Sequence, residues 1–421
     1  MTRTVLDVTR LLTRAGHPVA TGVDRVELAY ARRALAQEAA RVGFAAIVGR
    51  RAAPLPREDV AAFVAALDAK WRRGRAGGTA TGRLEARLGA TFPETADAPP
   101  APPGKDEALS RALRLRLKAM TSLRKPAVAA GERYLHVSHI RLDQPEVFER
   151  IASAGARLSI LVHDLIPIRF PEYGRPGEDA RHRRRMTTAI RTASTLIANS
   201  AETARDLAAF AQEIGAASPP AVTGLLGIEA GFSAGAPALA AAKPYFVALG
   251  TIEPRKNHLL LLHLWRRLAE RLGADAPTLV VVGRRGWENE MVVDLLERSP
   301  AIRAHVVEAN DLPDAALAAL VKGARALLFP SFAEGYGLPL AEALALGAPA
   351  LASDLPAFHE IASERVDYLD PLDGPAWERA VTELLAAASP RREALAARAQ
   401  GFVAPDWDAH FRAVADATGL D

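Results

Sequence analysis

The sequence lacks several features that would assign it to a special class of protein. It has no cysteine in 421 residues, which excludes disulfides, thiolate metal sites and a cysteine nucleophile. No run reaches the roughly 18 apolar residues of a membrane-spanning helix, and no apolar core of signal-peptide length follows residues 1–4. A formal net charge of +4 is slight for this length and argues against a dedicated nucleic-acid binder. These absences favour a cytoplasmic enzyme.

The composition and the order of patterns indicate a two-domain α/β protein. Hydrophobic residues make up 49% of the chain and charged residues 24%, which is an ordinary globular composition. Apolar runs of strand length alternate with helical patterns, so we expect two parallel, doubly wound sheets. An alanine-rich linker at 234–243 predicts a first domain over residues 1–235 and a second over 236–405.

The most informative stretch runs from Phe329 to Glu342. The apolar run at 326–329 predicts a buried parallel strand, and Leu338–Leu346 predicts a helix with a proline in its first turn. The glycine-containing loop between them then lies at the carboxyl end of the strand, where α/β proteins bind ligands. Free N–H groups at the helix start suit an anion such as a phosphate. The residues expected to bind such a ligand are Gly335, Tyr336, Gly337 and Leu338.

Two carboxylates bracket this helix start. Glu334 lies just before it and Glu342 about two turns inside, roughly 12 Å apart along the helix axis. The paired carboxylates of a glycoside hydrolase stand roughly 5 to 10 Å apart, so this spacing is too wide for that chemistry. It suits an elongated ligand with hydroxyls at both ends and negative charge between them, as in a nucleotide sugar. The alternative is a pair of exposed glutamates favoured by the helix dipole.

The pattern Pro-Ser-x-x-Glu-Gly-x-Gly-Leu-Pro-x-x-Glu resembles the signature of the family-four retaining glycosyltransferases. The resemblance implies the GT-B fold, in which two Rossmann-like domains face each other across a cleft. By this resemblance residues 1–235 form the acceptor-side domain and residues 236–405 the domain that binds the nucleotide-sugar donor. It further implies that Glu334 contacts the transferred sugar and Glu342 the ribose hydroxyls. The tail over 406–421 resembles the last helix of such proteins, which crosses back to the first domain.

Two adjacent cations follow the predicted strand Tyr245–Leu249. Arg255 offers a bidentate fork and Lys256 a point charge, so the pair suits the diphosphate that is left behind when a sugar is transferred. Exposed cations at a helix start are the alternative, but the helix dipole disfavours them there. Many family members carry an arginine directly after the glycine, where this chain has Thr251, which leaves the diphosphate to Arg255 and Lys256.

The first domain supplies two further candidates. Gly22 lies in Thr-Gly-x-x-Arg-Val, before a helical pattern expected from about Glu27 to Ala40, and is either part of the cleft or a turn glycine. His163 lies in His-Asp-Leu-Ile-Pro, which resembles a subgroup that builds bacterial surface polysaccharides. The resemblance implies that His163 faces the sugar, whereas a lone histidine beside a strand is more often structural. Asp164 either orients the imidazole or the acceptor, or caps a turn.

Residues 75–125 form a predicted insertion in the first domain. Its prolines between 93 and 103 predict a loop, and residues 105–125 predict a basic amphipathic helix. We expect its apolar side to face the core, with contact to an anionic membrane as the alternative. That apolar side consists of Leu109, Leu113, Leu117 and Met120.

The resemblance therefore implies a retaining hexosyltransferase that uses a nucleotide sugar and needs no divalent metal or other cofactor. GDP-mannose is the first choice of donor, with UDP-glucose, UDP-N-acetylglucosamine and dTDP-rhamnose left open. The expected acceptor is a lipid-linked saccharide for lipopolysaccharide, capsule or exopolysaccharide, reached from the cytoplasm or from the inner face of the membrane. Two alternatives are an epimerase of the same architecture, which uses no acceptor, and a non-catalytic scaffold of a polysaccharide-synthesis complex.

Overall fold

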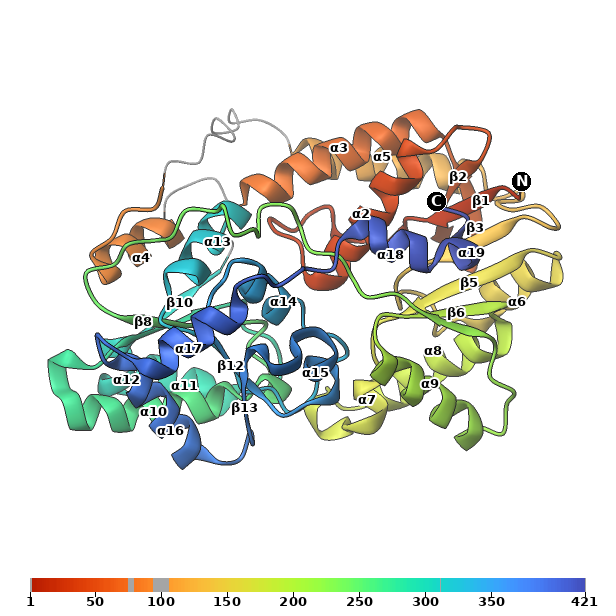
Figure 1. Cartoon of the computed structure of the whole chain (residues 1–421). Helices are drawn as coiled ribbons and strands as arrows, with labels where there is room; N and C mark the ends of the chain where they lie inside the picture. The colour runs from red at the N-terminus through yellow and green to blue at the C-terminus, as the bar shows by residue number, and fades with distance from the viewer. Residues whose placement is uncertain (1, 75–78, 94–105, 311, 421) are drawn as a thin grey trace.

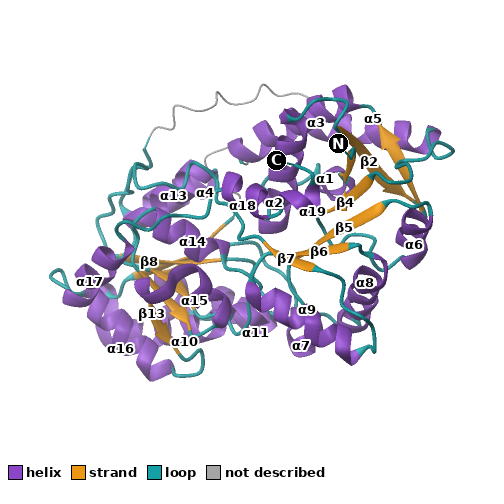
Figure 2. Ribbon diagram, turned by 45° about the vertical axis from the view of Figure 1, so that its right-hand side comes forward, coloured by secondary structure: helices purple, strands orange, loops and turns teal. Residues whose placement is uncertain are grey.

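The computed structural model describes residues 2–74, 79–93, 106–310 and 312–420. Two α/β domains lie side by side in it, each built on one sheet with helices on both faces (Figures 1 and 2). The predicted fold class of two mainly parallel sheets is confirmed.

The first sheet has, within the described residues, seven strands in the order β3-β2-β1-β4-β5-β6-β7. Only β3 runs antiparallel to its neighbour. All four residues of β1 are buried, as expected for a parallel strand covered on both faces. The strands are β1 (Thr4–Asp7), β2 (Val42–Val48), β3 (Arg51–Leu55), β4 (Arg133–His136), β5 (Arg157–Val162), β6 (Thr195–Ala198) and β7 (Ala221–Thr223).

The second sheet has six parallel strands in the order β10-β9-β8-β11-β12-β13, again counted over the described residues. Successive residues of β11 point to opposite faces, so Leu327 and Phe329 join one apolar cluster and Leu328 joins the other. The strands are β8 (Tyr245–Leu249), β9 (Thr278–Val282), β10 (Val306–Ala309), β11 (Leu327–Phe329), β12 (Ala350–Ser353) and β13 (Asp367–Leu369).

Both sheets reverse their strand order at an interior point. In the first sheet β1 pairs with both β2 and β4, and in the second β8 pairs with both β9 and β11. Loops that leave two such neighbouring strands in opposite directions open a crevice at the carboxyl ends of the strands, where ligands bind. The fold therefore predicts that functional residues follow β1 and β4 in one domain and β8 and β11 in the other.

Helices cover both faces of each sheet. Before β8 in the chain they are α1 (Thr9–Arg14), α2 (Gly22–Ala36), α3 (Arg57–Arg73), α4 (Thr79–Leu88), α5 (Glu107–Thr121), α6 (Pro145–Ser153), α7 (Ile166–Arg169), α8 (Glu178–Thr192) and α9 (Ala201–Glu213). The later helices are α10 (His258–Leu272), α11 (Glu290–Arg298), α12 (Pro300–His305), α13 (Asp314–Gly323), α14 (Leu338–Ala345), α15 (Pro356–Ala362), α16 (Gly374–Leu385), α17 (Pro390–Ala399), α18 (Trp407–Ala413) and α19 (Ala415–Thr418).

Helix α2 begins earlier than we expected. The predicted start near Glu27 was wrong, because Thr21 and Asp24 form a capping box that starts the helix at Gly22. The helix also ends earlier, at Ala36, because Gln37 is extended. Gly22 is therefore the first residue of a helix that points its N-terminus into the space between the domains.

The predicted insertion is divided between the two domains. Leu84 and Leu88 of α4 are fully buried in the core of the second domain, and α4 contacts β10. Burying a leucine side chain stabilises such a contact by about 1.5–3 kcal/mol. In contrast, α5 packs on α3 and β2 of the first domain. The proline-rich stretch expected as a loop lies, from residue 94 to 105, outside the described residues.

The expected orientation of α5 was wrong. Its apolar residues Leu109, Leu113, Leu117 and Met120 are exposed instead of facing the core. Alanines occupy most of the buried side, and their small size lets the helix lie close to α3 and the sheet. The buried residues of α5 are Ala108, Ala112, Leu115 and Ala119.

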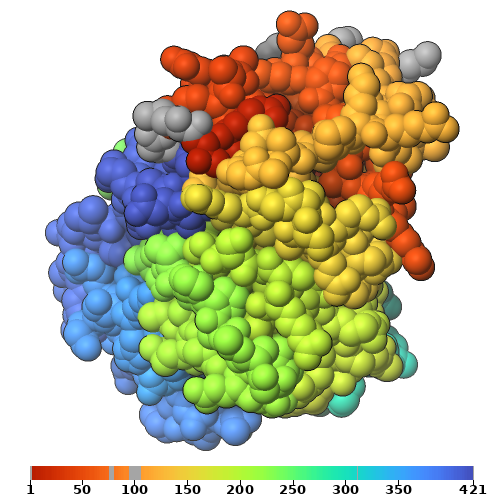
Figure 3. Space-filling view, turned by 90° about the vertical axis from the view of Figure 1, so that its right-hand side faces the viewer, coloured from red at the N-terminus to blue at the C-terminus, as the bar shows by residue number. Residues whose placement is uncertain are grey.

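The last two helices pack against the first domain. His410 of α18 lies 2.8 Å from the hydroxyl of Tyr30, and Thr4 donates to the carbonyl oxygen of Thr418 at 2.9 Å. Figure 3 shows the dark-blue end of the chain set against the red N-terminal part and the yellow-green part of the first domain. The chain thus returns from the second domain to the first.

Candidate functional site

The centre of the candidate site is an ion cluster where β8 and β11 end. The single turn η2 (Pro254–Lys256) follows β8 and carries two cations, and Glu334 follows β11. Glu334 Oε2 lies 2.7 Å from Nη1 of Arg255, and its Oε1 is paired with Nζ of Lys256. Ser331 Oγ donates to the same Oε1 at 2.8 Å. The switch point of the second sheet thus brings together three of the predicted site residues.

Burial and pairing determine the charges in this cluster. Burial raises the pKa of Glu334, but Arg255 and Lys256 more than offset this and hold it at about 2. Burial lowers the pKa of Lys256, although Glu334 opposes that shift. Nε of Arg255 also pairs with Glu253 at 2.7 Å, so two cations face two carboxylates. A diphosphate that binds these cations therefore competes with the two carboxylates for them.

The loop that leads into α14 is held tightly between the domains. Gly337 caps the helix at φ +120°, in the left-handed region that favours glycine. The carbonyl oxygen of Gly335 accepts hydrogen bonds from Ser200 Oγ at 2.7 Å and from Thr203 Oγ1 at 3.3 Å. Residues of the first domain therefore fix the position of the predicted anion-binding turn.

Two other predicted residues of this loop differ in what they offer a ligand. The Tyr336 side chain is buried and its hydroxyl donates to the carbonyl oxygen of Leu226 at 2.8 Å, so only its backbone can contact a donor. Leu338 begins α14, and its Cδ1 would lie 3.4 Å from a Cβ at Gly22. The first turns of α2 and α14 therefore meet across the domain boundary, with Gly22 at the contact.

His163 follows β5 and is almost fully buried. Its Nε2 lies 2.9 Å from the carbonyl oxygen of Val137, which fixes this nitrogen as the donor. Burial lowers the pKa of His163 to about 4, so the ring is neutral at physiological pH and Nδ1 keeps its lone pair. The backbone N–H of His163 donates to Nε2 of His139 at 3.0 Å, and Asn199 donates to its carbonyl oxygen at 2.9 Å. His163 is thus rigidly held and can accept a hydrogen bond from a hydroxyl.

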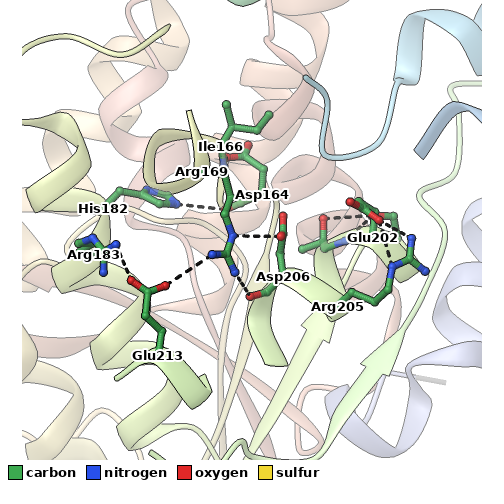
Figure 4. A network of polar contacts seen from close by, with 11 residues as sticks. Asp164, Ile166, Arg169, His182, Arg183, Glu202, Arg205, Asp206 and Glu213 are labelled. Carbon is green, nitrogen blue, oxygen red and sulfur yellow. Dashed lines mark hydrogen bonds and ion pairs between the residues drawn. The ribbon is translucent and has the colours of Figure 1, made fainter. Parts of the chain in front are cut away.

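Asp164 is used within its own turn. Its Oδ1 accepts from the N–H of Ile166 at 3.2 Å, and its carbonyl oxygen lies 3.1 Å from Nε2 of His182 (Figure 4). Nearby, the Arg169 guanidinium lies between Asp206 and a second carboxylate, which ties α7 to α9. Of the roles left open for Asp164, the structure shows the turn cap.

Glu342 faces a cation from the opposite domain. Its Oε1 lies 3.4 Å from Nη1 of Arg25 in α2, and Nη2 of Arg25 lies 2.6 Å from Oδ1 of Asp314. Burial raises the pKa of Glu342 to about 7; Arg25 opposes this shift, whereas Asp314 and Glu229 add to it. Glu342 is therefore part ionised and part protonated near neutral pH, which makes it sensitive to a ligand that needs the carboxylate.

A second group of cations lies on the side of the first domain, directly after β1. Nε of Arg10 and Nε of Arg14 lie 2.8 and 3.1 Å from the two oxygens of Asp24, which is fully buried. Nη1 of Arg14 lies 2.8 Å from Nε2 of His17. Burial lowers the pKa of Arg14, and repulsion from Arg284, on the loop after β9, adds to this shift. We call Arg10, Arg14 and Arg284 the acceptor-side cation group, after the role expected for the first domain. Together with Asp24 they carry more positive than negative charge, and they span the two domains.

Several residues of the site were missed at the level of sequence. Arg25 could have been predicted, because it is the arginine of the Thr-Gly-x-x-Arg-Val pattern. Arg10 and Arg14 follow the first strand at helical spacing, which is a usable signal for a charged helix face at a ligand edge. Glu253 and His139 carry no such signal, because their roles arise from contacts with chain segments far away in sequence.

Two searches of the described residues bear on the class of protein. Within them no helix is both long and apolar enough to cross a bilayer. Over the same ranges no three His, Asp or Glu side chains gather closely enough to hold a metal ion.

Comparison with known proteins assigns the second half of the chain. Residues 234–402 match the family model described as glycosyl transferases group 1. This match contains the whole ion cluster, the α14 loop and Glu342. It does not contain His163, Arg10 or Arg14.

The curated relatives are mannosyltransferases. The serotype-specific mannosyltransferase WbdA of Escherichia coli is 32% identical over 264 residues, which cover 58% of this chain and 32% of that protein. The O-antigen chain mannosyltransferase RfbU of Salmonella typhimurium is 33% identical over 144 residues, covering 33% of this chain and 38% of that protein. The chain thus matches about a third of the length of these relatives.

The solved structures support the fold. Sucrose-phosphate synthase from Thermosynechococcus elongatus superposes with a TM-score of 0.63 at 16% identity, covering 99% of this chain and 98% of that one. The structural neighbours include GT-B glycosyltransferases, and the predicted GT-B fold is confirmed for both domains.

Proposed function

We propose that the chain, whose residues 234–402 match the family model of the glycosyl transferases group 1, is a retaining hexosyltransferase. It moves a hexose from a nucleotide sugar to a saccharide acceptor in the synthesis of lipopolysaccharide, capsule or exopolysaccharide. The observation that carries this proposal is the convergence of Arg255, Lys256 and Glu334 at the switch point of the second sheet, beside the start of α14.

The cations act on the leaving group. Negative charge builds on the diphosphate as the bond to the sugar breaks, so Arg255 and Lys256 stabilise the transition state more than the bound substrate. In the structure both cations pair with Glu334. When diphosphate oxygens take its place, the Glu334 carboxylate is released and can accept hydrogen bonds from the sugar hydroxyls. Because two side-chain cations and a helix start neutralise the diphosphate, the proposed reaction needs no divalent metal or other cofactor.

The proposed reaction keeps the configuration of the sugar through attack on the same face as the leaving group. The bond from the acceptor oxygen to the anomeric carbon forms as the bond to the diphosphate breaks, and a phosphate oxygen takes the acceptor proton. His163 is neutral and its Nδ1 has a free lone pair, so it positions the sugar by accepting a hydrogen bond. Glu342 holds the ribose at the other end of the donor.

GDP-mannose remains our first choice of donor. The names of the relatives support mannose, because one is described as a serotype-specific mannosyltransferase and the other as an O-antigen chain mannosyltransferase. The names of these relatives do not say which nucleotide carries the mannose, so the nucleotide is the first variable to test.

We also propose that the acceptor is a saccharide carried by a lipid phosphate, which places the enzyme at the cytoplasmic face of a membrane. The acceptor-side cation group supports this part of the proposal. Arg10 and Arg14 share one carboxylate and face Arg284 of the other domain, which leaves positive charge for a phosphate. A neutral saccharide would need hydroxyl partners and gain little from these cations.

The test is a transfer assay with a panel of nucleotide sugars and a lipid-phosphate saccharide as acceptor. We expect mannose transfer from GDP-mannose, release of GDP, and a product with the anomeric configuration of the donor by NMR. Incubation with the donor alone is the control, and formation of an altered sugar there would favour an epimerase. A product with inverted configuration would contradict retention. If no donor were turned over, the non-catalytic scaffold would be the remaining alternative.

A further inference from the structure

Helix α5 presents an apolar stripe to the solvent. The exposed fractions of Leu109, Leu113, Leu117 and Met120 are 39%, 51%, 63% and 56%. Their spacing of three or four residues puts them on one side of the helix. Scattered exposed leucines are ordinary, but four in one continuous row on a helix that already buries its opposite side are not. This row, the α5 stripe, is not used by any other part of the described chain.

Basic side chains flank the α5 stripe. Residues 106–126 contain six Lys or Arg and two Asp or Glu, so their net charge of 6 − 2 = +4 equals that of the whole chain. Among the described residues no ion pair involves Arg114, Arg124 or Lys125, and all three are exposed. The other basic residues of α5 are held by the protein, as Lys118 is by Asp59. An apolar row beside unpaired cations complements the surface of a lipid bilayer, in which anionic head groups cover an apolar interior.

The α5 stripe lies next to the acceptor side of the cleft. Nη2 of Arg116 donates to the carbonyl oxygen of Leu12 in α1 at 2.9 Å. Nζ of Lys70 bonds the carbonyl oxygen of Ala15 at 2.7 Å and pairs with Asp106, the N-cap of α5. These contacts fix α5 to the segment that carries Arg10 and Arg14. The α5 helix and the first-domain members of the acceptor-side cation group are therefore attached to the same segment of the first domain.

We propose that the α5 stripe docks this protein on an anionic bilayer, with the helix lying in the plane of the interface. The physical basis of this docking is the exposed stripe and the flanking cations. The reason for docking, which is to reach a lipid-linked acceptor, rests on the proposed function. The apolar row is too short to hold the protein alone, so the flanking cations contribute, at about fivefold in the partition coefficient for each one near the surface. Salt screens this contribution.

The test is flotation of the full-length chain with vesicles of phosphatidylcholine alone or with phosphatidylglycerol. We expect binding to the anionic vesicles at low salt, a large loss at high salt, and little binding to the neutral vesicles. Leu113→Ser with Leu117→Ser should lower binding at least tenfold, because serine removes apolar area from the stripe. A second variant, with Arg114, Arg124 and Lys125 changed to Gln, should lower it by a similar factor.

The matched control changes two exposed apolar residues of the second domain, Met291→Ser with Leu372→Ser. These side chains are 67% and 78% exposed, so their loss should leave vesicle binding unchanged. Unchanged binding in the α5 variants, or equal binding to neutral vesicles, would overturn the proposal. So would a wild-type chain that ignores vesicles, or one that forms a dimer which the leucine variant abolishes.

Two further measurements separate this proposal from the proposed function. Donor binding by thermal shift should be the same in all variants, which shows that they are folded. Transfer to a water-soluble acceptor should also be unchanged. If vesicle binding depends on α5 but no transfer occurs with any donor, the docking surface stands and the proposed function fails.

Discussion

Gly335 lies directly against the backbone of His163, so that a Cβ at position 335 would be 2.2 Å from the His163 carbonyl oxygen and 2.8 Å from Cβ of Asp164. The contact joins the loop after β11 to the loop after β5, and therefore joins the donor domain to the domain that carries the histidine. Both loops belong to the candidate site. The closeness of the two domains thus depends on the absence of a side chain at one residue.

Gly335→Ala should separate the two loops. No rotamer can relieve a clash between a Cβ and a backbone oxygen, so the cost should be about 1–3 kcal/mol, as for other overpacked contacts. We expect a lower melting temperature, a larger radius of gyration by X-ray scattering and a lower kcat. Gly231→Ala is the control, because a Cβ there would meet nothing within 4 Å. Equal behaviour of the two variants would show that the contact is not needed.

Lys256→Ala should reduce the rate far more than it weakens nucleotide binding. Removing one contact to charge that develops in the transition state costs about 3 kcal/mol, roughly a hundredfold in kcat. Steady-state kinetics and calorimetry with the free nucleoside diphosphate measure the two effects. Lys243→Ala is the control, since that lysine is exposed and bonds only the carbonyl oxygen of Ala274. Near-normal turnover of the Lys256 variant would remove this residue from the site.

Glu342 should make nucleotide binding depend on pH. Burial raises its pKa to about 7, and the ribose hydroxyls need the ionised form as acceptor. Affinity for the nucleoside diphosphate should therefore rise from pH 6 to 8 and then level off. Glu342→Gln should bind more weakly, with KM raised and kcat nearly unchanged, and should lose this pH dependence. A pH profile that survives in the variant would assign the titration to another group.

The same shift has a consequence for stability with the opposite sign. The folded protein holds the Glu342 proton up to about pH 7, whereas the unfolded chain loses it near the usual value of 4.5. The unfolded state therefore binds fewer protons between these values, and this group's contribution to stability falls as pH rises through them. Denaturant unfolding of the wild type and of Glu342→Gln at several pH values should show the difference. Parallel pH curves for the two proteins would contradict it.

Arg14→Gln should weaken the acceptor and leave the donor alone. A hydrogen bond to a charged group contributes about 1.5–3 kcal/mol, so KM for a lipid-phosphate acceptor should rise about tenfold or more. The donor KM and the product configuration should not change. Asp24 keeps Arg10 as a partner in this variant, which limits the loss of stability. The matched control is an acceptor that lacks the phosphate; an equal rise in its KM would show that Arg14 does not bind the phosphate.

Sequence was sufficient for the parts of the fold and site that depend on local patterns. The strand before Glu334, the helix from Leu338 and the cation pair after β8 are each encoded within a dozen residues, and the structure has them all. Sequence did not reveal that Glu334 itself pairs with Arg255 and Lys256. That contact depends on β8 and β11 lying side by side, which no local pattern contains.

The orientation of α5 shows a different limit. The helix has two candidate apolar sides, one with larger residues around Leu113 and one with small residues around Ala112. Hydrophobicity alone favours the larger side for the core. Close approach to α3 favours the smaller side instead, and only the neighbouring surface decides between them.

The position of α4 limits how far the cleft can open. This helix is buried in the second domain through Leu84 and Leu88, whereas α3 before it belongs to the first domain. Five residues separate the end of α3 at Arg73 from the start of α4 at Thr79, and a chain gains at most about 3.6 Å per residue, so the two helix ends can lie at most about 22 Å apart. A wider separation of the two helices would require α4 to leave the core of the second domain. The length of this short connection therefore sets one upper limit on how far the cleft can open for a donor.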